Sequence, residues 1–126
     1  MSLKVVTTNG APSAIGPYSQ AIDAGNLVFV AGQVGRDPGT GELADGIEAQ
    51  SERVMNNIAA ILDAAGLTWA NVAKTTCMLA EMGDFDAFNA VYARFVSDPK
   101  PARATYAVKA LPRGALIEVE AVAVRG

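Results

Sequence analysis

Apolar residues recur at two different periods along the chain, and the changes of period predict its elements. Alternating or continuous apolar runs predict strands at residues 4–8, 21–24, 27–31, 71–81, 103–109 and 115–124. Spacings of three and four residues predict helices over 46–66 and 84–96. The chain has no internal repeat and no linker long enough to separate domains, so we expect a single domain over residues 1–126.

Capping and turn residues mark where several of these elements begin and end. Gly66 follows the apolar stripe of the first helix and suits its carboxyl end, because glycine tolerates the left-handed backbone that closes many helices. Asp84 suits the amino end of the second helix as a capping side chain. The dipeptide Gly25-Asn26 suits a tight hairpin turn. The strands on either side of the first helix are expected to be parallel, since a crossover joins them.

The last strand separates two faces of the expected sheet. Its small apolar set is expected under the helices and consists of Ala115, Ile117, Val119, Ala121 and Ala123. Two helices would then cover one face of a single mixed sheet, which is an α+β architecture. The opposite face keeps apolar residues that two helices cannot hide, including Met78, Val108, Val122 and Val124. We therefore expect this second face to pack against another copy of the chain.

Glu118 and Glu120 point away from the helices in this arrangement, and their neighbours depend on one turn. A hairpin with the four-residue loop LPRG at residues 111–114 would place Thr105 opposite Glu118 and Arg103 opposite Glu120. Arg103 and Thr105 would then share a face with both carboxylates. A loop one residue longer or shorter would reverse that parity.

Arg103 is an arginine inside an otherwise apolar strand, and two hypotheses account for it. In the first it forms a cross-strand ion pair with Glu120, worth about 0.2 to 1 kcal/mol when exposed. In the second its guanidinium binds the carboxylate of a small ligand through paired hydrogen bonds. The neighbouring Glu118 favours the second hypothesis, because two like charges on one semi-apolar face call for a cationic or electrophilic partner.

Composition narrows the chemistry further. The 126 residues are 51% hydrophobic with a net charge of -3 and no basic run, which disfavours nucleic-acid binding. Cys77 is the only cysteine and histidine is absent, so a zinc cluster and Ser-His-Asp or Cys-His catalysis have no residues to use. No apolar stretch reaches membrane-spanning length and no signal-peptide pattern is present. We expect a cytoplasmic protein with no metal, cofactor or membrane partner, acting on a small molecule.

Six motifs follow one another along nearly the whole chain. They are GPYSQA at 16–21, VAGQV at 30–34, NVAKTT at 71–76, FNAVYARF at 88–95, PARATY at 101–106 and LIEVEAVA at 116–123. With these motifs in this order and a chain of this length, the sequence resembles the RidA family of enamine/imine deaminases, also called YjgF or L-PSP. The resemblance implies a chorismate-mutase-like homotrimer with active sites in the clefts between subunits. It also implies hydrolysis of small 2-imino acids, of the 2-iminobutanoate and 2-iminopropanoate type, to 2-keto acids and ammonia.

The same resemblance assigns roles to individual residues. Arg103 would bind the substrate carboxylate and Glu118 would position the attacking water, while Tyr18 and Asn89 would line the pocket. Two substrate-binding positions depart from well-known members. They are Ala31, where many members have serine, and Thr105, where some have cysteine. The loss of the serine hydroxyl at Ala31 bears on fine substrate preference, whereas Thr105 keeps a small polar group.

Alternatives remain open at this point. Tyr18 could have a purely structural role, as an amphipathic side chain that packs over its Gly/Pro loop. Asn89 could likewise serve only to form hydrogen bonds with backbone groups. A non-enzymatic trimer that binds a keto acid or an amino acid is the second function hypothesis. Ribonuclease activity, the third, is disfavoured by the acidic charge balance and by the absence of histidine.

Overall fold

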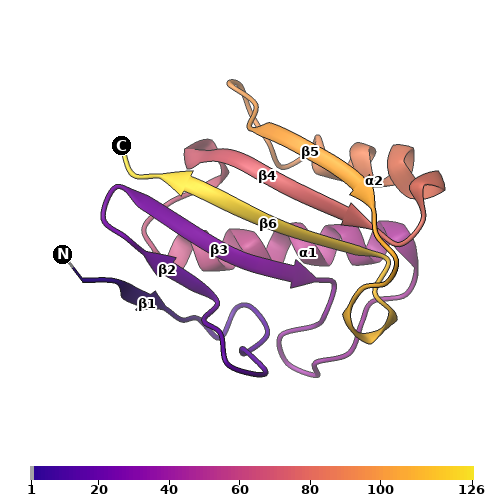
Figure 1. Cartoon of the computed structure of the whole chain (residues 1–126), viewed down its shortest axis with the longest axis horizontal. Helices are drawn as coiled ribbons and strands as arrows, with labels where there is room; N and C mark the ends of the chain where they lie inside the picture. Colours follow the sequence, from indigo (N-terminus) through magenta and orange to yellow (C-terminus); the bar gives the residue numbers. More distant parts are fainter. Residues whose placement is uncertain (1) are drawn as a thin grey trace.

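Alternating side chains build a mixed sheet of six strands. The computed structural model describes residues 2–126. Its strands are β1 (Lys4–Val6), β2 (Ala21–Asp23), β3 (Leu27–Val34), β4 (Val72–Leu79), β5 (Ala102–Ala107) and β6 (Ile117–Val124), in the spatial order β1-β2-β3-β6-β4-β5 (Figure 1). Every neighbouring pair is antiparallel except β4 and β5. Since β3 and β4 both run antiparallel to β6, they are parallel to each other, as the helix between them predicts.

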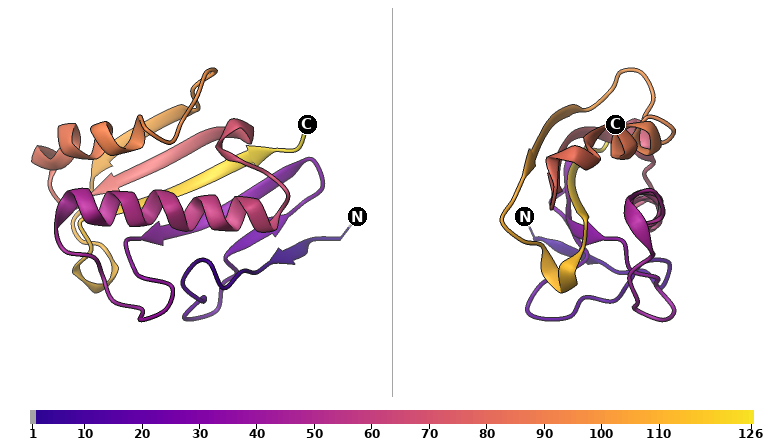
Figure 2. Two further views of the ribbon diagram at one scale, coloured as in Figure 1. Left: turned by 180° about the vertical axis from the view of Figure 1, so that it is seen from behind. Right: turned by 90° about the vertical axis from the view of Figure 1, so that its right-hand side faces the viewer.

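Two helices cover one face of this sheet, which confirms the expected α+β architecture. They are α1 (Gly46–Ala64) and α2 (Phe85–Tyr92), and both lie on the same side in Figure 2. Short 3-10 turns span Trp69–Asn71, Met82–Asp84 and Pro112–Gly114. None of the helices within residues 2–126 is long and apolar enough to cross a membrane.

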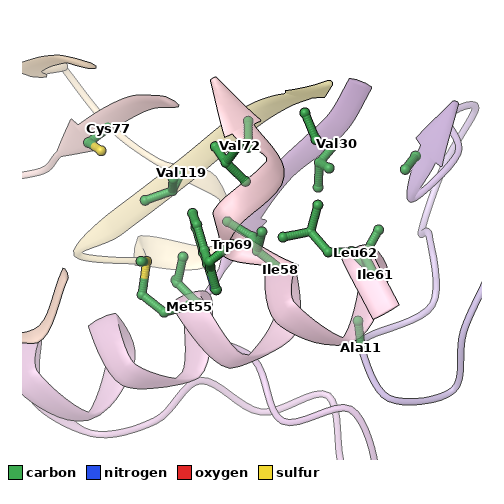
Figure 3. Close-up of a cluster of buried hydrophobic side chains, with 14 of the residues drawn as sticks. Ala11, Val30, Met55, Ile58, Ile61, Leu62, Trp69, Val72, Cys77 and Val119 are labelled. Carbon is green, nitrogen blue, oxygen red and sulfur yellow. The ribbon is translucent and has the colours of Figure 1, made fainter. Parts of the chain in front are cut away.

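The core lies between α1 and the centre of the sheet. The apolar stripe of α1 is fully buried and consists of Val54, Met55, Ile58, Ile61 and Leu62. It meets sheet residues that include Val30, Val72 and Val119 (Figure 3). The helical spacing of α1 and the period-two spacing of β6 therefore give two apolar surfaces that exclude water from each other.

The ends of the helices confirm one capping prediction and correct another. Gly66 has φ +78°, and the backbone N–H of Leu67 donates to the carbonyl of Leu62 at 2.8 Å, which closes α1 as predicted. The side chain of Asp84 makes no capping hydrogen bond, so the predicted cap is wrong. The 3-10 turn at Met82–Asp84 leads directly into α2, and the N–H of Asp84 donates to the carbonyl of Glu81.

The predicted hairpin between the last two strands is also wrong. β5 pairs in parallel with β4, where Arg103 opposes Thr75, and β6 lies between β3 and β4, where Glu120 opposes Thr76. The inner face of β6 is almost wholly buried, so this strand belongs in the middle of the sheet with partners on both sides. No residue of β5 is fully buried, as is typical of an edge strand.

This topology separates residues that the hairpin would have placed together. Arg103 is in register with the buried Thr75 and therefore points to the helix-covered face. Glu118 lies between the buried Ile117 and Val119 and therefore points to the uncovered face. The expectation that Arg103 and Thr105 share a face with Glu118 and Glu120 is incorrect.

The uncovered face exposes apolar residues beside Glu118 and Glu120, as the sequence predicts. Its strands expose large hydrophobic side chains at Leu27, Phe29, Tyr106 and Val124, each at least 39% accessible. These residues belong to β3, β5 and β6.

Ile58 tests the packing of α1. Truncating this buried side chain in Ile58→Ala leaves a cavity beneath the sheet, and the free energy of unfolding is expected to fall by about 2 to 5 kcal/mol. Urea titration monitored by circular dichroism measures the change. Asp63→Ala, at an exposed position of the same helix, is the matched control and is expected to stay within about 0.5 kcal/mol of the native chain. Equal losses in the two variants would contradict this description of the core.

Candidate active site

Arg103 is held by aromatic rings rather than by a carboxylate. Its guanidinium lies over the ring of Tyr92 at 4.8 Å and over that of Phe85 at 5.6 Å, and Nη1 donates to Oδ1 of Asn89 at 2.6 Å. Arg103 forms no ion pair with any acidic residue within residues 2–126. The ion-pair hypothesis with Glu120 is therefore wrong, and the guanidinium keeps donors free for an anion.

Hydrogen bonds among buried side chains hold Tyr92 beneath Arg103. The hydroxyl groups of Thr75 and Tyr92 share a hydrogen bond of 2.8 Å, and the thiol of Cys77 donates to Thr75. Burial raises the pKa of the Cys77 thiol and of the Tyr92 phenol, so both groups stay neutral. Cys77 is thus the inert core residue expected of a buried strand thiol.

Thr105 lies on the same face as Arg103, two residues along β5. Its Oγ1 is buried and has no hydrogen-bond partner within residues 2–126. A hollow of about 400 Å³ lies beside Arg103, and its lining includes Asn89 and Tyr92 but not Thr105. An anion bound there would meet the guanidinium and the Asn89 amide together.

Glu118 occupies a second hollow, on the uncovered face. This hollow has a volume of about 390 Å³ and is lined by Ile15, Tyr18, Ala31, Gly32, Val34, Arg36, Pro112, Arg113 and Glu118. Burial, with a smaller contribution from Glu120, raises the pKa of the Glu118 carboxyl above its ordinary value of 4.5. A carboxylate that is costly to ionise is a stronger proton acceptor, as a general base requires.

The strand next to Glu118 is shaped to receive its carboxylate. The register between β3 and β6 shifts between Val30 and Gln33, which marks an irregularity at Ala31 and Gly32. A Cβ atom on Gly32 would collide with the carboxylate of Glu118. Gly32 is therefore required for the position of Glu118, because any larger residue would displace the acid.

Tyr18 lines the Glu118 hollow from a loop that is tied to the sheet. The Tyr18 hydroxyl accepts from the backbone N–H of Ile15 at 3.2 Å, and the side chain is 48% accessible. The buried amide of Gln20 anchors the loop by donating to the carbonyls of Thr8, Ala11 and Pro12. Tyr18 thus has a defined conformation while its ring faces the hollow.

The predicted site residues fall into two groups on opposite faces of one sheet. Arg103, Asn89 and Thr105 form the first group, which we call the anion half-site. Glu118, Tyr18 and Ala31 form the second, which we call the acid half-site. Within one chain the sheet separates the two half-sites, so a single small molecule cannot contact both.

Sequence reasoning missed several residues of these half-sites. Phe85 and Tyr92 fit the core stripe of a helix, and nothing in their spacing indicates that they also support an arginine. Arg36 and Arg113 lie in loops, where sequence pattern gives no direction for a side chain. The single glycine inside the strand motif VAGQV is the one signal that could have indicated a close approach at Gly32.

Comparisons with known proteins give a consistent result. The model of the protein family described as Endoribonuclease L-PSP matches residues 8–125. A mouse protein named 2-iminobutanoate/2-iminopropanoate deaminase is 46% identical over 124 residues, covering 98% of this chain and 92% of its own. The crystal structure of RidA from the Antarctic bacterium Psychrobacter sp. aligns with TM-score 0.95 at 43% identity, over 97% of this chain and 99% of its own. That of E. coli TdcF with bound serine aligns with TM-score 0.94 at 37% identity, over 98% and 99%.

The raised pKa of Glu118 predicts a pH-dependent effect of Glu118→Gln. The folded-state pKa lies above that of the unfolded chain, so the native glutamate stabilises fully below the unfolded value and loses this contribution as pH rises through the folded value. Glutamine does not titrate. The variant is therefore expected to gain stability relative to the native chain as pH rises from about 4.5 upward. Urea unfolding at a series of pH values measures this difference, and a constant or falling difference would contradict the burial of an ionised Glu118.

Proposed function

The chain belongs to the Endoribonuclease L-PSP family, and we propose that it is an enamine/imine deaminase that hydrolyses small 2-imino acids to 2-keto acids and ammonia. Family membership confirms the resemblance that the six sequence motifs indicate. The relative from mouse carries the name of this activity over nearly the same length. A bound amino acid in the TdcF relative is further support for a small ligand that contains a carboxylate.

The unpaired guanidinium of Arg103 is the observation that carries this proposal. Two rings and the Asn89 carbonyl oxygen hold it in place before any ligand arrives, so binding costs little side-chain entropy. A 2-imino acid carries a carboxylate next to its reacting carbon. Fixing that carboxylate therefore fixes the imine carbon as well.

The reaction needs a water molecule and a proton acceptor beside the imine carbon. The oxygen of the water molecule bonds to the imine carbon while Glu118 accepts a proton from that water, which gives a tetrahedral carbinolamine. Glu118 then returns this proton to the nitrogen, the carbon–nitrogen bond breaks and ammonia leaves. The hydroxyl group of the carbinolamine passes its proton to Glu118 as the carbonyl of the keto acid forms. The raised pKa of Glu118 suits both proton steps, because the same group takes a proton and returns it.

A complete site requires two copies of the chain, and we place it between subunits of a homotrimer. The anion half-site and the acid half-site lie on opposite faces of the sheet in one copy. The uncovered face exposes apolar residues such as Phe29 and Val124. Burial of this face against a neighbouring copy would bring an anion half-site of one subunit to the acid half-site of the next.

Binding without turnover is the second candidate, favoured by the bound serine in the TdcF relative. In that case a keto acid or amino acid would occupy the same two half-sites. The two candidates differ at Glu118. Replacing it with glutamine would abolish hydrolysis but leave binding through Arg103 intact.

Arg103→Ala tests the carboxylate clamp. Loss of paired, charge-assisted hydrogen bonds is expected to lower kcat/KM about 10- to 100-fold, and Arg103→Lys is expected to recover only part of it because an ammonium cannot form the planar pair. Release of keto acid from imines generated in situ by an amino-acid oxidase measures the rate. Arg94→Ala, which removes a surface arginine paired with Glu52, is the matched control and is expected to leave the rate unchanged. Full activity of Arg103→Ala would remove the clamp.

Mixing two impaired variants tests whether the site lies between subunits. In Arg103→Ala every anion half-site is defective, and in Glu118→Gln every acid half-site is defective. Random assembly of equal amounts leaves both halves intact at one half times one half of the sites, so about a quarter of native activity is expected to return. Co-refolding followed by native mass spectrometry verifies that mixed assemblies form. Mixed assemblies without activity would place the whole site within one chain or would remove one of the two residues from it.

A further inference from the structure

Two arginines line the acid half-site without an acidic partner. Arg36 follows β3 and Arg113 lies in the turn before β6, and both border the hollow that contains Glu118. Neither forms an ion pair with any carboxylate within residues 2–126. The hollow therefore brings together two guanidinium groups whose charge the described chain leaves unbalanced.

Hydrogen bonds hold the side chain of Arg36 and the backbone turn that carries Arg113. Nε of Arg36 donates to the carbonyl of Gly41 at 3.0 Å, and the residue is half-buried. The backbone of Arg113 has φ +59° within a 3-10 turn, and the N–H of Gly114 closes that turn on the carbonyl of Leu111 at 3.2 Å. Each side chain is thus presented by a loop that its own hydrogen bonds hold.

Glu118 does not serve as the missing partner of these arginines. The groups that raise the pKa of Glu118 are its own burial and Glu120, and no arginine lowers it. A guanidinium in contact would favour the ionised carboxylate and reduce its pKa. Glu118 forms no salt bridge with either arginine within residues 2–126. The hollow has a volume of about 390 Å³, which is within the range of small-molecule sites.

We infer that Arg36 and Arg113 form a second anion subsite, which makes 2-imino acids with an additional side-chain carboxylate good substrates. This inference rests on the deaminase proposal. The carboxylate next to the imine binds Arg103, the imine carbon faces Glu118, and the distal carboxylate receives hydrogen bonds from Arg36 and Arg113. The reaction is unchanged, since water adds to the imine carbon and ammonia leaves. Imines of four- and five-carbon amino dicarboxylic acids fit this arrangement.

The test compares two imines on one set of variants. Imines of glutamate and of 2-aminobutanoate are generated in situ with amino-acid oxidases, and kcat/KM is measured for each. The native chain hydrolyses both, and the ratio of the acidic to the neutral substrate is expected to fall about 10- to 100-fold in Arg36→Met and in Arg113→Asn. Asparagine tolerates the left-handed backbone at position 113, so that variant removes the charge with little strain. Arg36→Lys keeps the charge and is expected to recover most of the ratio.

Arg94→Leu is the control, because Arg94 pairs with Glu52 and does not line the hollow. This variant is expected to leave the ratio unchanged. An unchanged ratio in both subsite variants, or a native chain that hydrolyses only the neutral imine, would overturn the subsite. A change of oligomeric state without a change of ratio would assign the arginines to subunit contacts and would also overturn it.

Failure of the deaminase proposal gives a different result, since the native chain then hydrolyses neither imine. Calorimetric binding of 2-oxoglutarate and 2-oxobutanoate decides the subsite in that case. The native chain is expected to bind 2-oxoglutarate more tightly, and Arg36→Met is expected to remove the difference. Equal affinities for the two keto acids in the native chain would overturn the subsite without any reference to turnover.

Discussion

The burial of β6 in the middle of the sheet determines where every functional group lies. The inner residues of β6 are buried beneath the helices, and β6 pairs with β3 on one side and β4 on the other. With one face of the strand buried, the parity of the pleat leaves Glu118 no orientation except the uncovered face. The same placement moves β5 to the edge of the sheet, where Arg103 reaches the aromatic residues of α2. Core packing thus sets the distance between the two chemical groups, although neither belongs to the core.

Charge and shape are arranged differently on the two faces. On the helix side, a cation lies against two rings and an amide, and a neutral hydroxyl row supports the ring beneath it. On the uncovered side, a carboxylate is placed where burial makes ionisation costly, and a glycine provides the space. Each of these two arrangements is formed within a single chain. This division explains why a protein without histidine can have a reactive site.

The sequence predicted the helices, the buried face of β6 and the direction of Glu118, because these depend on local periodicity. The sequence did not predict the partner of β5, because the residue pattern of a strand shows which face is buried but not which strand pairs with it. Proximity along the chain favoured a hairpin, whereas the fully apolar inner face of β6 required the central position. The sequence favoured a ligand for Arg103 on the ground that Arg103 shares a face with Glu118 and Glu120, and that ground is incorrect. The guanidinium is unpaired since Glu118 and Glu120 lie on the other face of the sheet.

The two outermost strands limit how the sheet can extend. β1 has only three residues and begins with Lys4, while β5 is entered through Pro99 and Pro101 and carries a charged residue near its start. Short, charged or proline-flanked borders are poor templates for the backbone of another molecule. Endless pairing of sheets edge to edge, the route to fibrils, is therefore disfavoured in this fold.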